Sequence, residues 1–169
     1  MAFRIGGDYF RPVNGRYIGQ FKGVEDGKPT QHTDNGVTKT TNTIRWQFLL
    51  YNIDGTPVID PKKPGEVALV DGLSSDSVGI GRGVPAKARV WLTALLASKG
   101  LTFVEPRTVD DVNAMIASVI DVWAYLTFGN NTKNVGGTLK EIEPYTAQAA
   151  QAPVAAPAVP PAPVAAPVA

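Results

Sequence analysis

Aromatic side chains on a short apolar segment are the residues of this sequence with the clearest chemistry. Trp123 and Tyr125 are two residues apart, so both point to the same side of an extended strand. A pair of rings on an open strand can stack nucleobases, at roughly 1–3 kcal/mol per base. The alternative is that a helix, the C-terminal tail or a partner subunit covers both rings.

Basic and polar side chains on two further segments extend this hypothesis. Arg45 and Tyr51 alternate with apolar residues, and Arg16 and Lys22 lie on a run nearer the N-terminus. Such groups can contact phosphates, although arginine and lysine on an exposed strand are also ordinary solubilising residues. The candidate nucleic-acid-binding residues are Trp123, Tyr125, Arg45, Tyr51, Lys22, Arg16, Lys133 and Arg82.

Catalytic and metal-binding groups are sparse in this chain. His32 is the only histidine and there is no cysteine, which excludes a typical zinc site and thiol chemistry. Asp71, Asp76 and the pair at 110–111 could bind Mg²⁺, but such carboxylates more often cap helices and turns. We therefore predict no catalytic residue, no metal site, no cofactor and no enzymatic activity.

A glycine-rich run at residues 79–83 precedes the predicted main helix. Glycines ahead of a helix can let backbone amides approach an anion. The Gly-Lys-Ser/Thr ending of a P-loop is missing, however, and no strand precedes the run at the spacing of a dinucleotide-binding fold. We interpret the run as a flexible linker, with a backbone contact to nucleic acid as the alternative.

Alternation of apolar and polar residues predicts the strands. The predicted strands cover residues 16–24, 41–51, 56–59 with a resumption at 66–70, 119–128 and 138–145. In the second of them Trp46 and Phe48 belong to the inward set. The polar residues 25–40 predict a long connection of the functional or mobile kind.

Two helices are expected between the third and fourth strands. Apolar residues at helical spacing between Pro85 and Gly100, Trp91 among them, predict the main helix. Thr108 stands three residues ahead of Asp111, which is the pattern of a capping box and predicts a short second helix.

Charge and hydropathy bound the class of protein. The net charge of +1 over 169 residues gives little support to a nucleic-acid partner by itself. Residues 1–50 and 77–100 are basic and could form one basic side, or the charges could simply be scattered. With no signal peptide and no run of roughly 18 apolar residues, we expect a soluble cytoplasmic protein that does not enter the membrane.

The composition changes after Tyr145. Residues 146–169 carry no charge and are rich in alanine, proline and valine. We expect one domain over residues 1–145, followed by a disordered Ala/Pro-rich tail over 146–169 that folding does not require. The order of elements in the domain, β-β-β-α-β-β, predicts an all-β fold with one main helix, specifically a five-stranded OB-fold barrel.

Three stretches carry a resemblance to a known family. They are Pro12-x-x-Gly15-x-Tyr17, Arg45-Trp46-Gln47-Phe48 and the helical run from Lys87 to Leu95. The chain resembles small OB-fold proteins of tailed bacteriophages that bind single-stranded DNA or assist replication. The resemblance implies a protein that coats single-stranded DNA during phage replication or recombination in the host cytoplasm. The tail lacks the acidic tip of the cellular single-strand-binding proteins.

Two hypotheses about function follow. The first is sequence-independent binding of single-stranded DNA, by base stacking on strand aromatics and by phosphate contacts, with a homo-oligomer possible. The second is a structural or protein-interaction OB module of a phage, with no nucleic-acid activity and with its aromatics buried in an oligomer or virion interface. The near-neutral charge favours the second.

Overall fold

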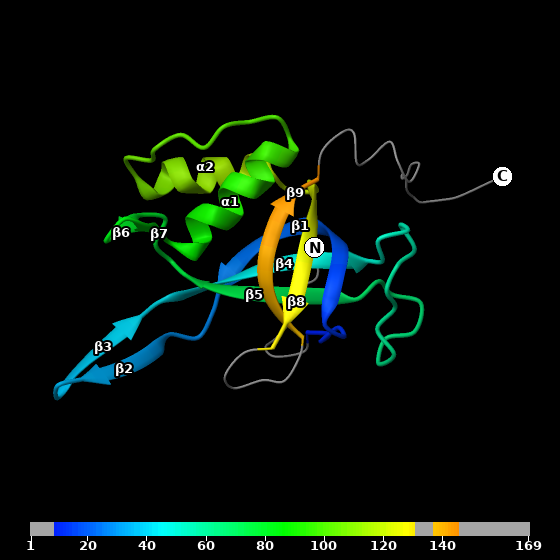
Figure 1. Cartoon of the computed structure of the whole chain (residues 1–169), viewed down its shortest axis with the longest axis horizontal. Helices are drawn as coiled ribbons and strands as arrows, with labels where there is room; N and C mark the ends of the chain where they lie inside the picture. The colour runs from blue at the N-terminus through cyan, green and yellow to red at the C-terminus, as the bar shows by residue number, and fades with distance from the viewer. Residues whose placement is uncertain (1–8, 131–136, 146–169) are drawn as a thin grey trace.

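A computed structural model describes residues 9–130 and 137–145 of the chain (Figure 1). The elements in chain order are β1 (Gly15–Asp26), β2 (Thr30–Asp34), β3 (Val37–Thr41), β4 (Thr43–Tyr51), β5 (Leu69–Ser75), β6 (Ile80–Gly81), β7 (Val84–Pro85), α1 (Lys87–Ser98), α2 (Val109–Ser118), β8 (Trp123–Gly129) and β9 (Thr138–Pro144). The fold is therefore mostly β, with two helices inserted between β5 and β8.

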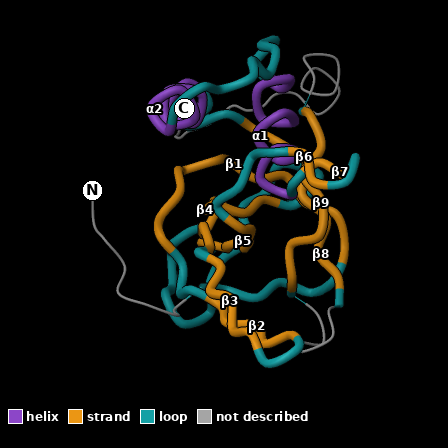
Figure 2. The backbone as a smooth tube through the Cα atoms, turned by 90° about the vertical axis from the view of Figure 1, so that its left-hand side faces the viewer, coloured by secondary structure: helices purple, strands orange, loops and turns teal. Residues whose placement is uncertain are grey.

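Five of the strands form one antiparallel sheet in the order β5-β4-β1-β8-β9. The strands curl around a common interior, and both helices lie at one end of it (Figure 2). A register shift between Phe21 and Gly23 marks a bulge in β1, and bulges bend a strand and increase its twist. The long, bent β1 can thus pair with both β4 and β8.

The inner face of the sheet holds the core. Trp46, Phe48 and Leu50 alternate along β4 and are at most 1 % exposed, as the sequence predicts. Phe21 on β1 packs against both rings, with centroid distances of 5.7 Å to Trp46 and 5.3 Å to Phe48. The indole N–H of Trp46 donates to Ser74 Oγ at 2.8 Å, which satisfies its one buried donor.

Helix α1 fills the space between the two edge strands, β5 and β9. Its Trp91 contacts Trp46 edge-on, with the ring centroids 5.9 Å apart. Gly72 on β5 leaves room for this ring, because a Cβ there would come within 2.8 Å of Trp91 Cη2 and 2.5 Å of Leu139 Cδ2. The two edges lie close together at this glycine.

The five-stranded sheet is confirmed, but the barrel is not closed. Within the described residues β5 and β9 do not pair through backbone hydrogen bonds, and the sheet order ends at each of them. The side chains of Trp91 and Leu139 crowd Gly72 between these strands. Helix and side-chain contacts therefore bridge the two edges.

Residues 25–40 differ from the long irregular connection expected of them. They include most of a β-hairpin, β2–β3, in which Thr30 pairs with Thr41 and His32 with Lys39. All its strand residues are exposed, so neither face carries the apolar alternation by which a strand is recognised. The hairpin extends away from the main sheet (Figure 1).

The third strand lies further along the chain than predicted. The stretch 56–59 contributes only isolated bridges, Tyr51 to Pro57 and Ile59 to Val67, and the continuous strand is β5. Inward positions after Val70 are Gly72 and Ser74, which give no apolar signal. The predicted linker at 79–83 contributes to the short β6–β7 hairpin, and α1 begins just after it.

The fourth strand begins four residues later than predicted. Val119 is fully buried at the C-cap of α2, and Asp121 has φ of 68°, which a regular strand does not allow. The capping box predicted for α2 is confirmed, since Thr108 Oγ1 accepts from the amide of Asp111 at 3.2 Å. Lys133 and the tail, residues 146–169, lie outside the described residues.

Candidate nucleic-acid interface

The outer face of the sheet carries four rings that we call the aromatic layer: Tyr51, Trp123, Tyr125 and Tyr145. Tyr51 and Trp123 meet edge to face with centroids 5.0 Å apart, and Tyr125 and Tyr145 lie at the same separation, tilted by 32°. All four are half-buried. The sequence prediction that Trp123 and Tyr125 share the face opposite the core agrees with this arrangement.

The register explains why these rings gather. Ile18 in the middle of β1 pairs with Tyr51 on one side and Tyr125 on the other, so the two rings flank it. Gln20, the next outward residue of β1, pairs with Trp123. Ile18 points away from the core yet is only 4 % exposed. The aromatic layer therefore forms an apolar surface over β1.

The Arg16 side chain packs against the Tyr125 ring of the aromatic layer. Its guanidinium carbon lies 4.1 Å from the centroid of Tyr125, and its Nη2 donates to Glu143 Oε1 at 2.6 Å. Tyr125 is thus already in contact with Arg16 and Tyr145. Trp123 has only the edge contact with Tyr51 among the ring pairs of the described residues, so it has more ring surface for a ligand.

Lys22 also has a carboxylate partner, because its ammonium forms an ion pair with Asp121. Both side chains are partly exposed, and an ion pair of this kind contributes little to stability. With Arg16 paired to Glu143, the two cations flanking the layer are each balanced by an anion. Their charge toward a phosphate is accordingly reduced.

Arg45 lies in a polar network on the other half of the outer face, with Tyr9, Glu25, Gln47 and Asp71. Its Nη1 donates to Asp71 Oδ2 at 2.8 Å, and its Nε lies 3.7 Å from Glu25 Oε1. Only 17 % of the arginine side chain and 12 % of the Asp71 side chain are exposed. Arg45 is therefore in the predicted place on the outer face, but its charge is used within the protein.

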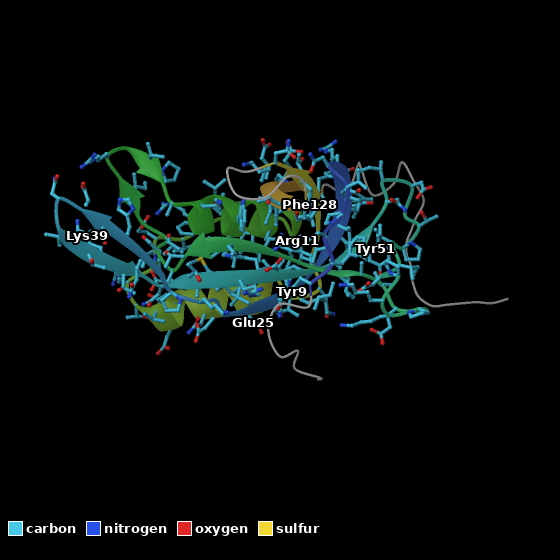
Figure 3. All side chains as sticks on the ribbon, turned by 90° about the horizontal axis from the view of Figure 1, so that it is seen from below. Tyr9, Arg11, Glu25, Lys39, Tyr51 and Phe128 are labelled. Atoms are coloured by element: carbon cyan, nitrogen blue, oxygen red, sulfur yellow. The ribbon has the colours of Figure 1, made fainter. Side chains whose placement is uncertain are left out.

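Tyr9 covers this polar network, and nothing in the sequence pattern singles it out. Its hydroxyl donates to Glu25, and Gln47 Nε2 donates to that hydroxyl at 2.9 Å. Its ring centroid lies 4.8 Å from the guanidinium carbon of Arg45. Figure 3 shows Tyr9 over the sheet between Glu25 and Tyr51. Tyr9 belongs to no strand, so periodicity cannot identify it.

Burial shifts several ionisation equilibria on this face. Desolvation raises the pKa of Tyr51. Desolvation, and then the charge repulsion of the neighbouring Tyr125 phenol, raise the pKa of Tyr145. The pKa of Asp71 is raised by burial, which outweighs the opposing effect of Arg45. For Tyr9 burial and the hydrogen bond to Glu25 raise the pKa. Tyr9, Tyr51 and Tyr145 therefore remain neutral rings at physiological pH.

Two further cations, Lys39 and Arg82, lie on the β2–β3 and β6–β7 hairpins and not on the five-stranded sheet. Lys39 lies on the exposed β2–β3 hairpin, at the end of the molecule far from Tyr51 (Figure 3). Arg82 lies at the turn of β6–β7 with φ of 52°, and it is exposed. The hairpins originate from the same end of the sheet, where Asn42 Nδ2 donates to Asp76 Oδ2 at 3.3 Å.

The part of the chain that the structure describes holds neither a metal-binding cluster nor a membrane-spanning helix. No group of three or more histidine, cysteine or acidic side chains gathers in the part of the chain that the structure describes. Asp71 pairs with Arg45 and Asp111 caps α2, while Asp76 accepts from Asn42. Neither α1 nor α2, the helices of residues 9–130 and 137–145, is long and apolar enough to cross a bilayer.

Comparison with known proteins yields no match to the chain, whether to family models, to curated protein sequences or to solved structures.

Proposed function

We propose that this protein binds single-stranded DNA without sequence preference, by stacking bases on the aromatic layer. The carrying observation is that four rings, from β4, from β8 and from the end of β9, form one continuous surface on the outer face. Stacking on such rings is tolerant of sequence because every base has a π-face. The resemblance to phage single-strand-binding proteins supports a role in DNA replication or recombination in the host cytoplasm.

The architecture supports an OB-type fold, which we propose as the finer description of the sheet. OB-folds are five-stranded, partly open Greek-key barrels with a helix between the third and fourth strands, and many bind oligonucleotides on their strand faces. Here α1 and α2 stand at that position, and Gly72 and Leu139 bring the two free edges together. The aromatic layer lies on the outer face of such a barrel.

A titration of fluorescently labelled oligo-dT tests the proposal. Trp123→Leu keeps an apolar cover over Ile18 but removes the ring, and we expect it to weaken binding by roughly 1–3 kcal/mol. Phe103→Leu is the matched control, because that half-buried ring contacts Arg89 on the helical side, 4.4 Å from the guanidinium carbon. Equal affinities of the two variants would contradict the proposal.

One observation favours a second candidate, a protein-interaction module. Arg16, Lys22 and Arg45 all have carboxylate partners, so the outer face offers few free positive charges to a phosphate backbone. In this case the aromatic layer would bind another protein surface, a second copy of the chain included. Sedimentation would then show that Trp123→Leu changes the oligomeric state, while oligo-dT would not bind to either form.

A further inference from the structure

We propose that Tyr9 is a further stacking residue, which extends the aromatic layer across the outer face toward β4 and β5. This inference rests on the proposed binding of single-stranded DNA. It adds a residue from outside the sheet, carried by an N-terminal segment that neither the sequence pattern nor the resemblance identifies. It also assigns a path to the bound DNA strand over the outer face, from Tyr125 past Trp123 toward Tyr9.

The position of the Tyr9 ring is fixed by three partners. Its hydroxyl is held by Glu25 and by Gln47, and its ring lies on Arg45. The next residue strengthens this anchoring, because the Phe10 amide donates to the Leu69 carbonyl at 2.9 Å and its ring packs against the core. A ring that is already ordered loses little conformational entropy when a ligand stacks on it.

The orientation of the ring leaves one of its faces toward solvent. Arg45 belongs to β4 and pairs with Asp71 on β5, so its guanidinium lies on the outer face of the sheet. Tyr9 is half-buried and belongs to no strand, and the residue after it bonds to the backbone of β5. The ring therefore lies outside the guanidinium, with the opposite face directed away from the sheet.

The register relates the position of Tyr9 to that of Trp123 through Gln47. Gln47, which holds the Tyr9 hydroxyl, is two residues before Leu49 on β4. Leu49 pairs with Gln20 on β1, and Gln20 pairs with Trp123. Two residues along a strand span about 7 Å. Gln47, the partner of Tyr9, is thus one row of side chains along the sheet from Trp123 and two strands, about 10 Å, across it. One extended single strand of DNA can span this separation and reach both rings.

Two substitutions at Tyr9 separate the ring from the hydroxyl. Tyr9→Phe and Tyr9→Leu both lose the bonds to Glu25 and Gln47, but only the first keeps an aromatic face. In oligo-dT titrations of the full chain we expect Tyr9→Phe to bind within about twofold of the unmodified protein. We expect Tyr9→Leu to bind about 5- to 150-fold more weakly, which corresponds to the loss of one stacked base. Thermal unfolding of both variants checks that their stabilities are alike.

A second measurement needs no substitution. Oligo-dT carrying 5-iodouracil crosslinks to stacked aromatic rings on irradiation, and mass spectrometry of the unmodified protein locates the attached residue. Crosslinks to Tyr9 together with the difference between phenylalanine and leucine support the inference. Equal binding of Tyr9→Phe and Tyr9→Leu, or crosslinks to Trp123 with none to Tyr9, overturns it and leaves the proposed function intact. Absence of any oligo-dT binding overturns both.

Discussion

Two groups of aromatic rings lie on opposite sides of the five-stranded sheet, and their surroundings differ. The inner group, Phe21, Trp46, Phe48 and Trp91, is at most 1 % exposed. The outer group, which is the aromatic layer, is half-buried and flanked by ion pairs. Trp46 and Tyr51 are both residues of β4, so strand alternation alone sends similar side chains to different environments. The inner rings stabilise the fold, whereas the outer rings keep ring surface that a partner can use.

The largest effect that distinguishes the two groups is expected in stability. Trp91→Ala removes a fully buried indole between α1 and β5, and it should lower the free energy of unfolding by about 3–5 kcal/mol. Urea denaturation measures this change. Trp123→Ala is the comparison and should cost much less, because that ring is half-exposed. Similar losses for both would mean that the outer rings are part of the core.

The outer rings, in contrast to the inner ones, are expected to affect the affinity for oligo-dT more than the stability of the fold. The double change of Trp123 and Tyr125 to alanine should weaken oligo-dT binding by roughly 2–4 kcal/mol if the stacking contributions add. Most of the loss should come from Trp123, since Tyr125 is already engaged by Arg16 and Tyr145. If the protein instead unfolds or changes its oligomeric state at unchanged affinity, the layer is a protein interface.

A glycine on the inner face should respond to added volume. Gly72→Val would force a side chain against Trp91 and Leu139, which overpacks the space between the two edge strands. We expect a loss of about 1–3 kcal/mol in the free energy of unfolding, read from urea denaturation. Gly81→Ala is the control, because a Cβ at that position meets nothing within 4 Å. A stable Gly72→Val variant would show that the edges separate easily.

A smaller effect should follow from releasing a cation of the outer face. Glu143→Gln leaves Arg16 without its carboxylate, so the arginine can contact a phosphate. The slope of log affinity against log salt should become steeper by about 0.7, the value for one contact with a single strand. Glu105→Gln is the matched control, since it changes net charge equally but frees Arg89 on the helical side. Equal slopes would place the bound strand away from Arg16.

The smallest effect is expected from removing the tail. Truncation after Tyr145 deletes residues that contain no large apolar side chain and no charge. The melting temperature followed by circular dichroism should be nearly unchanged. A decrease of more than a few degrees would mean that the tail packs on the domain. The aromatic layer, which includes Tyr145, would then be the first surface to test for this contact.

The parts of the fold that the sequence predicts are those with a repeating apolar pattern. Strand β4 and helix α1 are recognisable because Trp46, Phe48 and Trp91 recur at the spacing of a strand or a helix. The β2–β3 hairpin is missed because both its faces are polar, and β5 is shifted because Gly72 and Ser74 take inward positions. Propensity and pattern describe a buried face, and these segments have none that is apolar.

The candidate site is predictable to a similar extent. Spacing by two places Trp123 and Tyr125 on one face, but it cannot show which ring a neighbour covers. Pairing of Arg45 with Asp71 joins residues 26 positions apart, and Tyr9 reaches Gln47 across 38 positions. Such contacts depend on the curl of the sheet and on the path of the N-terminal segment. A single sequence read locally contains neither.

The β2–β3 hairpin makes the molecule easy to label. Among the strands of residues 9–130 and 137–145 the hairpin pairs with no other, so a change at its end should not disturb the core. Asn35 and Gly36 form its turn with positive φ, and Val37 beside them is 58 % exposed. Because the chain contains no cysteine, Val37→Cys would introduce a single thiol. A dye or a surface linker attached there would stand about 17 Å beyond the base of the hairpin, with the aromatic layer left free.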